Sequence, residues 1–190
     1  MSYDANNAYG SGAENAPGAG YGPGAAFGAD LDGTKSPDDL SRPLYGATFG
    51  QAVRRFWKKF SVFSGRASRS EYWFAYLFQV LVLLVPYILV IVGTVMSTAT
   101  TASSSYSPYS TPTAEPSGPG VAIMIIGWIL LVILALAMVV PYLAISWRRL
   151  HDANLAGPFW FLTFIPGVGG LIVLVLMILP SKPEGRRFDT

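Results

Sequence analysis

The sequence contains no cysteine and a single histidine, His151, in 190 residues. Without cysteine, the chain has no disulfides, no thiolate nucleophile and no cysteine ligand for a metal. No HExxH spacing supplies the ligands of a zinc site, and no GxSxG sequence marks a serine nucleophile. We therefore expect no metal, no cofactor and no catalytic residues.

Charged residues are also scarce. Asp, Glu, Lys and Arg make up 13% of the chain, whereas soluble domains carry about 25%. Hydrophobic residues make up 52% and form three long runs, so the composition predicts an integral membrane protein. The formal net charge of +2 is too small to indicate a nucleic-acid partner. Because the first apolar run begins only near Trp73, we expect an internal segment, and not a signal peptide, to lead insertion.

The N-terminal part divides into two regions. Residues 1–46 are rich in Gly, Ala, Pro and Tyr and poor in large aliphatics, which predicts a disordered tail. Residues 47–63 predict a basic amphipathic helix that lies on an anionic membrane surface. The alternative is a helix that packs on the protein's own spans or on a partner. The apolar stripe of this helix consists of Phe49, Val53, Phe56 and Phe60.

The remaining residues, 64–190, form the predicted membrane domain. Its apolar runs predict transmembrane helices at about 73–96, 121–145 and 158–179. As a helix, the first run is about 36 Å long, against a bilayer core of about 30 Å. A Ser/Thr/Pro-rich external loop, 97–120, joins the first two runs. The predicted fold class is therefore an all-α integral membrane protein with three transmembrane helices.

The third run contains the sequence IPGVGG, Ile165–Gly170, near its middle. It either crosses the membrane as a kinked helix or enters as a hairpin and returns. The arms of a hairpin would reach only about 10–14 Å. They would also leave backbone groups in need of cover inside the bilayer. We therefore predict a kinked full span.

The distribution of Lys and Arg predicts the orientation, because these residues collect in cytoplasmic loops. Six lie just before the first run, two follow the second and three follow the third. A cytoplasmic N-terminus places eight of them inside and three outside, and the opposite orientation reverses these numbers. A hairpin in place of the third span would place all eleven inside. We predict a multi-pass protein with a cytoplasmic N-terminus.

Two charged motifs lie on the same membrane face in this topology. GRASRSEYW, 65–73, leads into the first run, and RRLHD, 148–152, ends the second. Ser68 and Glu71 have the spacing of a helix capping box. If the motifs pack together, their arginines are suited to hold anionic lipid headgroups or a partner. The alternative is a purely topogenic and structural role. The candidate contact residues are Arg66, Arg69, Glu71, Arg148, Arg149, His151 and Asp152.

The order of GRASRSEYW, RRLHD and IPGVGG resembles the DUF805 family of small bacterial inner-membrane proteins of unknown function. The resemblance covers roughly Phe56 to Phe188. It implies a helical membrane fold and a location in the bacterial cytoplasmic membrane. The family has no established activity, so the resemblance implies no catalytic residues. The long N-terminal tail and the Ser/Thr/Pro-rich loop look like additions to the family's compact form.

The predicted spans contain no Asp, Glu, Lys or Arg, whereas proton-coupled transporters and ion pathways usually need one there. We therefore predict a non-enzymatic interaction, scaffold or accessory protein at the inner leaflet. Its expected partners are anionic lipid headgroups and a membrane protein or a second copy of the chain. The alternatives are a small transporter or channel component that acts as an oligomer, and a lipid-modifying membrane enzyme.

Overall fold

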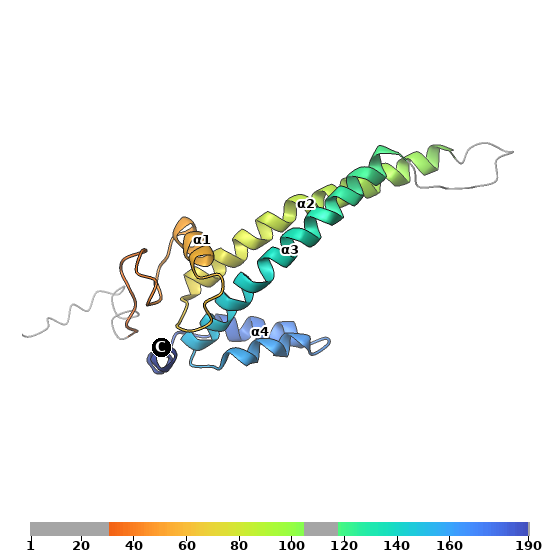
Figure 1. The fold of residues 1–190 in the computed structure, drawn as a ribbon. Coiled ribbons are helices and arrows are strands. Elements are labelled where there is room, and N and C mark those ends of the chain that lie inside the picture. Colours follow the sequence, from red (N-terminus) through yellow and green to blue (C-terminus); the bar gives the residue numbers. More distant parts are fainter. Residues whose placement is uncertain (1–30, 105–117, 190) are drawn as a thin grey trace, which may run out of the picture.

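The structure, a computed structural model, describes residues 31–104 and 118–189 (Figure 1). These residues form helices and connecting segments without a β-strand, which confirms the all-α prediction. Most of the predicted tail and part of the Ser/Thr/Pro-rich loop lie outside the described residues. In chain order the elements are α1 (Phe49–Lys58), α2 (Arg69–Ser104), α3 (Pro119–Asp152), the 3₁₀ helix η1 (Gly157–Phe164), α4 (Gly169–Ile178) and the 3₁₀ helix η2 (Pro183–Phe188).

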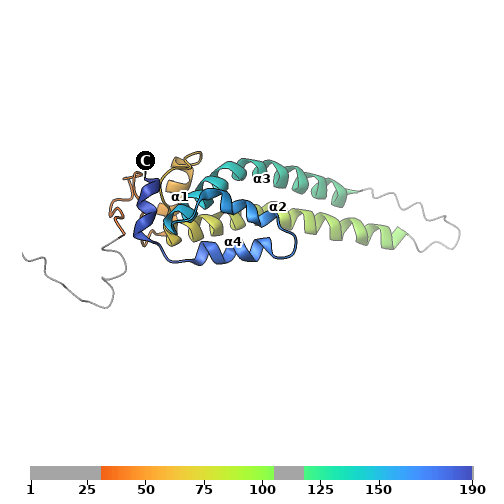
Figure 2. The same cartoon turned by 90° about the horizontal axis from the view of Figure 1, so that it is seen from below.

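Helices α2 and α3 form a long antiparallel pair that runs side by side in both views (Figures 1 and 2). By length and composition both can cross a membrane, and only 11% of the most apolar stretch of each is buried. Their apolar side chains therefore face outward, unlike those of a core helix in a soluble protein. Gly127 lets the backbones approach closely, because a Cβ there would lie 2.8 Å from the amide nitrogen of Val90.

The third apolar run does not cross beside this pair. Instead, η1 and α4 form a hairpin that starts and ends at the terminus of α3 (Figure 1). Gly167, with a φ of 82°, lies in the turn between the two arms. After α4, the amide of Lys182 donates to the carbonyl of Asp152 over 2.8 Å. The prediction of a full span at 158–179 is therefore wrong, and the hairpin alternative describes the structure.

The hairpin has a simple physical basis. Each arm is about 15–16 Å long, which is half of a bilayer core of about 30 Å. A hairpin with irregular arms would leave backbone groups unpaired inside the bilayer. Both arms are helical, however, so most of their backbone groups form hydrogen bonds within the arm. Aromatic contacts join the first arm to α3, with ring centroids 5.9 Å apart for Trp147 and Phe161 and 6.4 Å apart for Tyr142 and Trp160.

The N-terminal region also differs from its prediction. Residues 31–46, assigned by composition to the disordered tail, pack against the start of α2, and Leu44 is buried among them. Helix α1 is present as predicted, but it packs on α2, and its buried face includes Arg55 and Phe56. This packing is the alternative that the sequence left open for the amphipathic helix.

Candidate functional site

Buried polar side chains gather at the end of the helix pair where α2 begins and α3 ends. Six of the seven candidate residues are buried there, and only Arg69 is exposed. The two motifs do meet, since the amide of Ala67 donates to the carbonyl of Arg148 over 3.0 Å. The six buried residues are Arg66, Glu71, Arg148, Arg149, His151 and Asp152.

Glu71 caps α2, as its spacing from Ser68 predicts. The Ser68 amide donates to Glu71 Oε2 over 2.9 Å, and the Glu71 amide donates to Ser68 Oγ over 3.2 Å. Glu71 Oε2 also accepts from the amide of Leu44 over 3.2 Å, and Oε1 accepts from Arg55 Nε. Both carboxylate oxygens are thus occupied, so Glu71 is a structural residue that joins α1 and residues 31–46 to α2.

Arg66 holds the C-terminal segment. Its Nε donates to both carboxylate oxygens of Asp189, over 3.1 and 2.9 Å, and its Nη2 donates to Oδ2 over 2.6 Å. This forked contact is a strong, geometrically specific pairing. Arg66 Nη1 also donates to the carbonyl of Leu31 over 2.8 Å. One buried guanidinium therefore ties the two ends of the described chain together.

Arg149 and Asp152 hold the hairpin. Arg149 Nη1 lies 2.8 Å from Asp152 Oδ2, and Arg149 Nε donates to the carbonyl of Met177 over 3.1 Å. Asp152 Oδ1 accepts from the Tyr45 hydroxyl over 2.7 Å, and Oδ2 accepts from Ser181 Oγ. Burial and the neighbouring Asp152 carboxylate raise the pKa of Tyr45, so its hydroxyl remains a donor. We call Arg66, Arg149, Asp152 and Asp189 the balanced group, because it holds two cations and two carboxylates.

His151 is a packing residue of the same region. Its ring stacks on that of Phe188, with centroids 4.0 Å apart and an angle of 4° between the planes. Its Nδ1 lies 3.1 Å from the carbonyl of Gly65, and because a carbonyl only accepts, Nδ1 carries the proton. Among the residues described, His151 has no carboxylate partner and belongs to no group of three potential metal ligands. His151 therefore packs between the first motif, through Gly65, and the C-terminal segment, through Phe188.

A second set of buried charges is unbalanced. Arg55, Lys59, Glu71 and Arg148 are 2%, 5%, 2% and 1% exposed, respectively. Only Arg55 lies within ion-pair distance of Glu71. We call these four residues the cationic group, because three positive charges face one negative charge.

Carbonyls supply the other contacts of this group. Arg148 Nε donates to the carbonyl of Ala144 over 3.3 Å, and Arg148 Nη2 to that of Lys59 over 3.5 Å. Lys59 Nζ donates to the carbonyl of Leu40 over 2.7 Å. Burial, and next the charge of Arg148, lower the pKa of Lys59 to about 8. Within the described parts of the chain, neither Lys59 nor Arg148 forms an ion pair with a carboxylate.

Several residues of this site were absent from the predicted set. Arg55 and Lys59 looked like the solvated face of an amphipathic helix, and their basic character gave no sign of burial. Asp189 and Tyr45 lie far in sequence from their partners in the motifs. Asp189 is 123 positions from Arg66, and Tyr45 is 107 positions from Asp152. No local pattern marks such partners, although Asp189 is one of only two acidic residues after α4.

Comparison with known proteins connects this architecture to a family. A family described as "Protein of unknown function (DUF805)" matches residues 60–190. The "Inner membrane protein YhaI" of Escherichia coli K12 is 28% identical over 131 residues, which cover 69% of this chain and 86% of the relative. The protein of the same name from Escherichia coli O157:H7 gives the same values. No solved structure matches. The matched region contains the whole balanced group and excludes α1.

Proposed function

Because the chain belongs to the DUF805 family, whose activity is unknown, we propose its role from the geometry of its charged end: a non-enzymatic scaffold or accessory protein of the bacterial cytoplasmic membrane. The main support is the state of the buried carboxylates. Glu71, Asp152 and Asp189 each pair with an arginine, so each already has a structural role. The paired side chains hold a platform onto which residues 31–46, α1, the hairpin and the C-terminal segment dock.

The orientation we propose places this platform at the inner leaflet. All 13 Lys and Arg residues lie outside 70–147. The hairpin returns the chain to the end of α3, so the basic residues after it are at the same end as those before α2. By the positive-inside tendency, this end is cytoplasmic. With the hairpin in place of a third span, no Lys or Arg is left outside. The E. coli relative's description as an inner membrane protein supports the location.

The proposed partners are anionic lipid headgroups and a membrane protein or a second copy of the chain. Of the candidate contacts, only Arg69 presents an exposed side chain; the other arginines are buried against protein groups. On α1, Arg54 and Lys58 are also largely exposed. Each basic group near an anionic surface contributes on the order of 1 kcal/mol. We therefore assign headgroup contact to these exposed residues and a structural role to the six buried candidate residues.

Reporter fusions test the topology. Alkaline phosphatase, which is active only outside the cytoplasm, and green fluorescent protein, which is fluorescent inside it, are fused after Thr190 and inserted between residues 105 and 117. We expect fluorescence from the C-terminal fusion and phosphatase activity from the loop insertion. Phosphatase activity after Thr190 would contradict the hairpin and restore a third crossing.

Photo-crosslinking tests the scaffold role. A photoreactive amino acid replaces Trp57, exposed on α1, or Phe164, exposed near the hairpin turn. In native membranes we expect a discrete protein adduct from position 57 and lipid adducts from position 164. The absence of any protein adduct at position 57 and at the neighbouring exposed Phe60 would contradict the scaffold role.

A further inference from the structure

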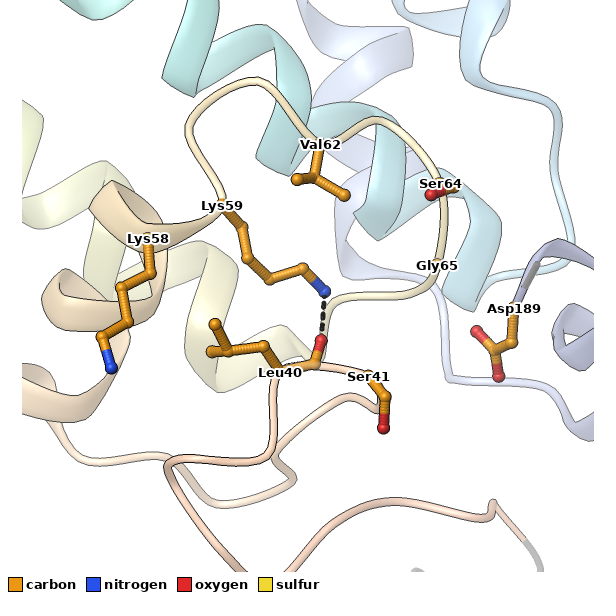
Figure 3. Close-up of a pocket in the computed structure, with 8 residues that line it drawn as sticks. All are labelled: Leu40, Ser41, Lys58, Lys59, Val62, Ser64, Gly65 and Asp189. Atoms are coloured by element: carbon orange, nitrogen blue, oxygen red, sulfur yellow. Dashed lines mark hydrogen bonds between the residues drawn. The ribbon is translucent and has the colours of Figure 1, made fainter.

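A hollow of about 360 Å³ lies between the end of α1, the segment that follows it and the C-terminal segment (Figure 3). Lys58 and Lys59 line one side of the hollow, and Asp189 lies across from them. Ser41 and Ser64 add hydroxyl groups to the lining. The hollow is partly open to its surroundings.

The cationic group provides the reason for a ligand here. Its three cations share one carboxylate, and all four side chains are almost completely buried. A buried charge without a counter-ion is strongly unfavourable, and the usual remedy is a partner of opposite charge. Lys59 is the member of the group that lines the hollow, and one of its three donor positions is used by Leu40. Two positions remain to bind an anion.

The carboxylates near the hollow do not meet this need. Asp189 accepts from Arg66 with both of its oxygens, so its charge is already matched. Asp38 lies 2.7 Å from Arg54 and farther, at 3.8 Å, from Lys58. Asp39 accepts from the amide and hydroxyl of Ser41 and forms no ion pair with the described residues. Lys59 and Arg148 therefore remain buried cations without a carboxylate within ion-pair distance.

We propose that this hollow binds the phosphate group of an anionic ligand, with the Lys59 ammonium as the main contact and the Ser64 hydroxyl as a further donor. Lysine binds phosphate as a point charge, and a phosphate group offers several acceptor oxygens to ammonium and hydroxyl donors. The lowered pKa of Lys59 agrees with this assignment, because burial and next the charge of Arg148 disfavour its ammonium form.

A phosphate group reaches this position from either of two sources. One is the headgroup of an anionic phospholipid, since the hollow lies at the charged end of the helix pair. This source rests on the inner-leaflet orientation proposed above. The other is a soluble phosphate ester, which needs no particular orientation. The chemistry of the contact with Lys59 is the same for both.

The test uses the full chain, purified in a neutral detergent or in nanodiscs. Soluble probes are inorganic phosphate and glycerol 3-phosphate, with sodium chloride at equal ionic strength as the control. Lipid probes are nanodiscs of phosphatidylcholine with or without phosphatidylglycerol. The readouts are the melting temperature and phospholipid retention in native mass spectrometry. The variant is Lys59→Met, and its matched control is Lys182→Met, which removes the same charge from an exposed position.

We expect ligand binding in the wild type and in Lys182→Met, and at least about tenfold weaker binding in Lys59→Met, as for the loss of a charge-assisted hydrogen bond. Without ligand, Lys59→Met should melt at the same or a higher temperature, so weaker binding would not reflect unfolding. A higher melting temperature with the soluble probes identifies a soluble ligand. Retention of phosphatidylglycerol without any effect of the soluble probes on the melting temperature identifies a lipid.

Equal binding by Lys59→Met and the wild type would overturn the proposal, as would the absence of any effect from both kinds of probe. Failure here is separable from failure of the proposed function. The reporter fusions report orientation without any ligand, and binding of glycerol 3-phosphate in detergent does not depend on orientation.

Discussion

The balanced group and the cationic group lie at the same end of the helix pair and differ in how their charges are matched. In the balanced group, each guanidinium lies within 2.8 Å of a carboxylate oxygen, and the partners come from α3 and the segments flanking the helices. In the cationic group, one carboxylate serves three cations, and backbone carbonyls supply the other contacts. The balanced group joins chain segments through fully matched ion pairs. The cationic group retains an excess of positive charge that an anion would neutralise. Buried arginines therefore have two different roles in this region. Arg66 and Arg149 hold segments together through carboxylates, whereas Arg148 contributes unmatched positive charge.

The largest effect is expected from Asp152→Ala in the balanced group. It leaves Arg149 buried without its carboxylate and removes the acceptor of Tyr45 and Ser181. Breaking one partner of a buried pair lowers the free energy of unfolding by about 3–5 kcal/mol. The measurement is thermal and denaturant unfolding in detergent. The double variant Arg149→Met, Asp152→Ala should lose less than the two single variants combined, and strict additivity would show that the pair is not coupled.

The next effect concerns the pH dependence of the cationic group. Lys59 is packed near Arg55 of α1, Glu71 of α2, Arg148 of α3 and Asp189 of the C-terminal segment, and its pKa is lowered to about 8. Between about pH 8 and the ordinary pKa of 10.5, the unfolded chain retains a proton at Lys59 that the folded chain has released. Stability from this residue therefore rises with pH in that window, by on the order of 2 kcal/mol.

Lys59→Met should flatten that rise, while Lys182→Met should leave it unchanged. The measurement is the melting temperature in a series of buffers from pH 7 to pH 10 without phosphate. A wild-type curve that falls or stays level across this window would contradict the assignment of Lys59 as an unpaired buried cation.

A smaller effect is expected from Asp189→Asn. The carboxylate of Asp189 is partly accessible, so its loss is less severe than that of Asp152, at about 1–2 kcal/mol. The expected local consequence is faster hydrogen exchange in residues 183–188, because Arg66 no longer holds that segment. The exposed Glu184→Gln, which removes the same charge nearby, is the control. Equal exchange in the two variants would show that the ion pair does not hold the C-terminal segment.

The smallest effect is expected from Arg69→Gln. Arg69 is the one exposed member of the candidate contacts, so its substitution should change the free energy of unfolding by less than about 0.5 kcal/mol. Weaker retention of phosphatidylglycerol, with unchanged stability, would fit the proposed headgroup contact. A loss of stability as large as that of Asp152→Ala would remove the distinction between exposed and buried members of the motifs.

Sequence reasoning succeeded where the controlling interactions are local or follow from hydropathy. Ser68 and Glu71 are three positions apart, so their capping box is visible in the sequence, and the two longest apolar runs became α2 and α3. It failed at the third run, because an apolar hairpin and a kinked span have the same composition. The Gly and Pro residues of IPGVGG and the basic residues after it were the available signals.

Residues 31–46 were missed for another reason. Their attachment depends less on apolar burial than on the Arg55 guanidinium, which donates to the carbonyls of Asp39 and Arg42 over 2.6 and 2.5 Å. Composition gives the content of large apolar side chains, but it does not reveal hydrogen bonds to backbone carbonyls. The same limit hid the burial of Arg55 itself, because only the folded segment supplies its partners.

The pairing of Arg66 with Asp189 has a consequence for how the protein is made. Arg66 leaves the ribosome 123 residues before its carboxylate partner, Asp189. Both long helices and the hairpin are synthesised between the two residues. During this interval the guanidinium has to remain solvated or associate with lipid phosphate. The charged end can therefore close only after Asp189 has been made, when the pair of α2 and α3 and the hairpin of η1 and α4 have already been synthesised.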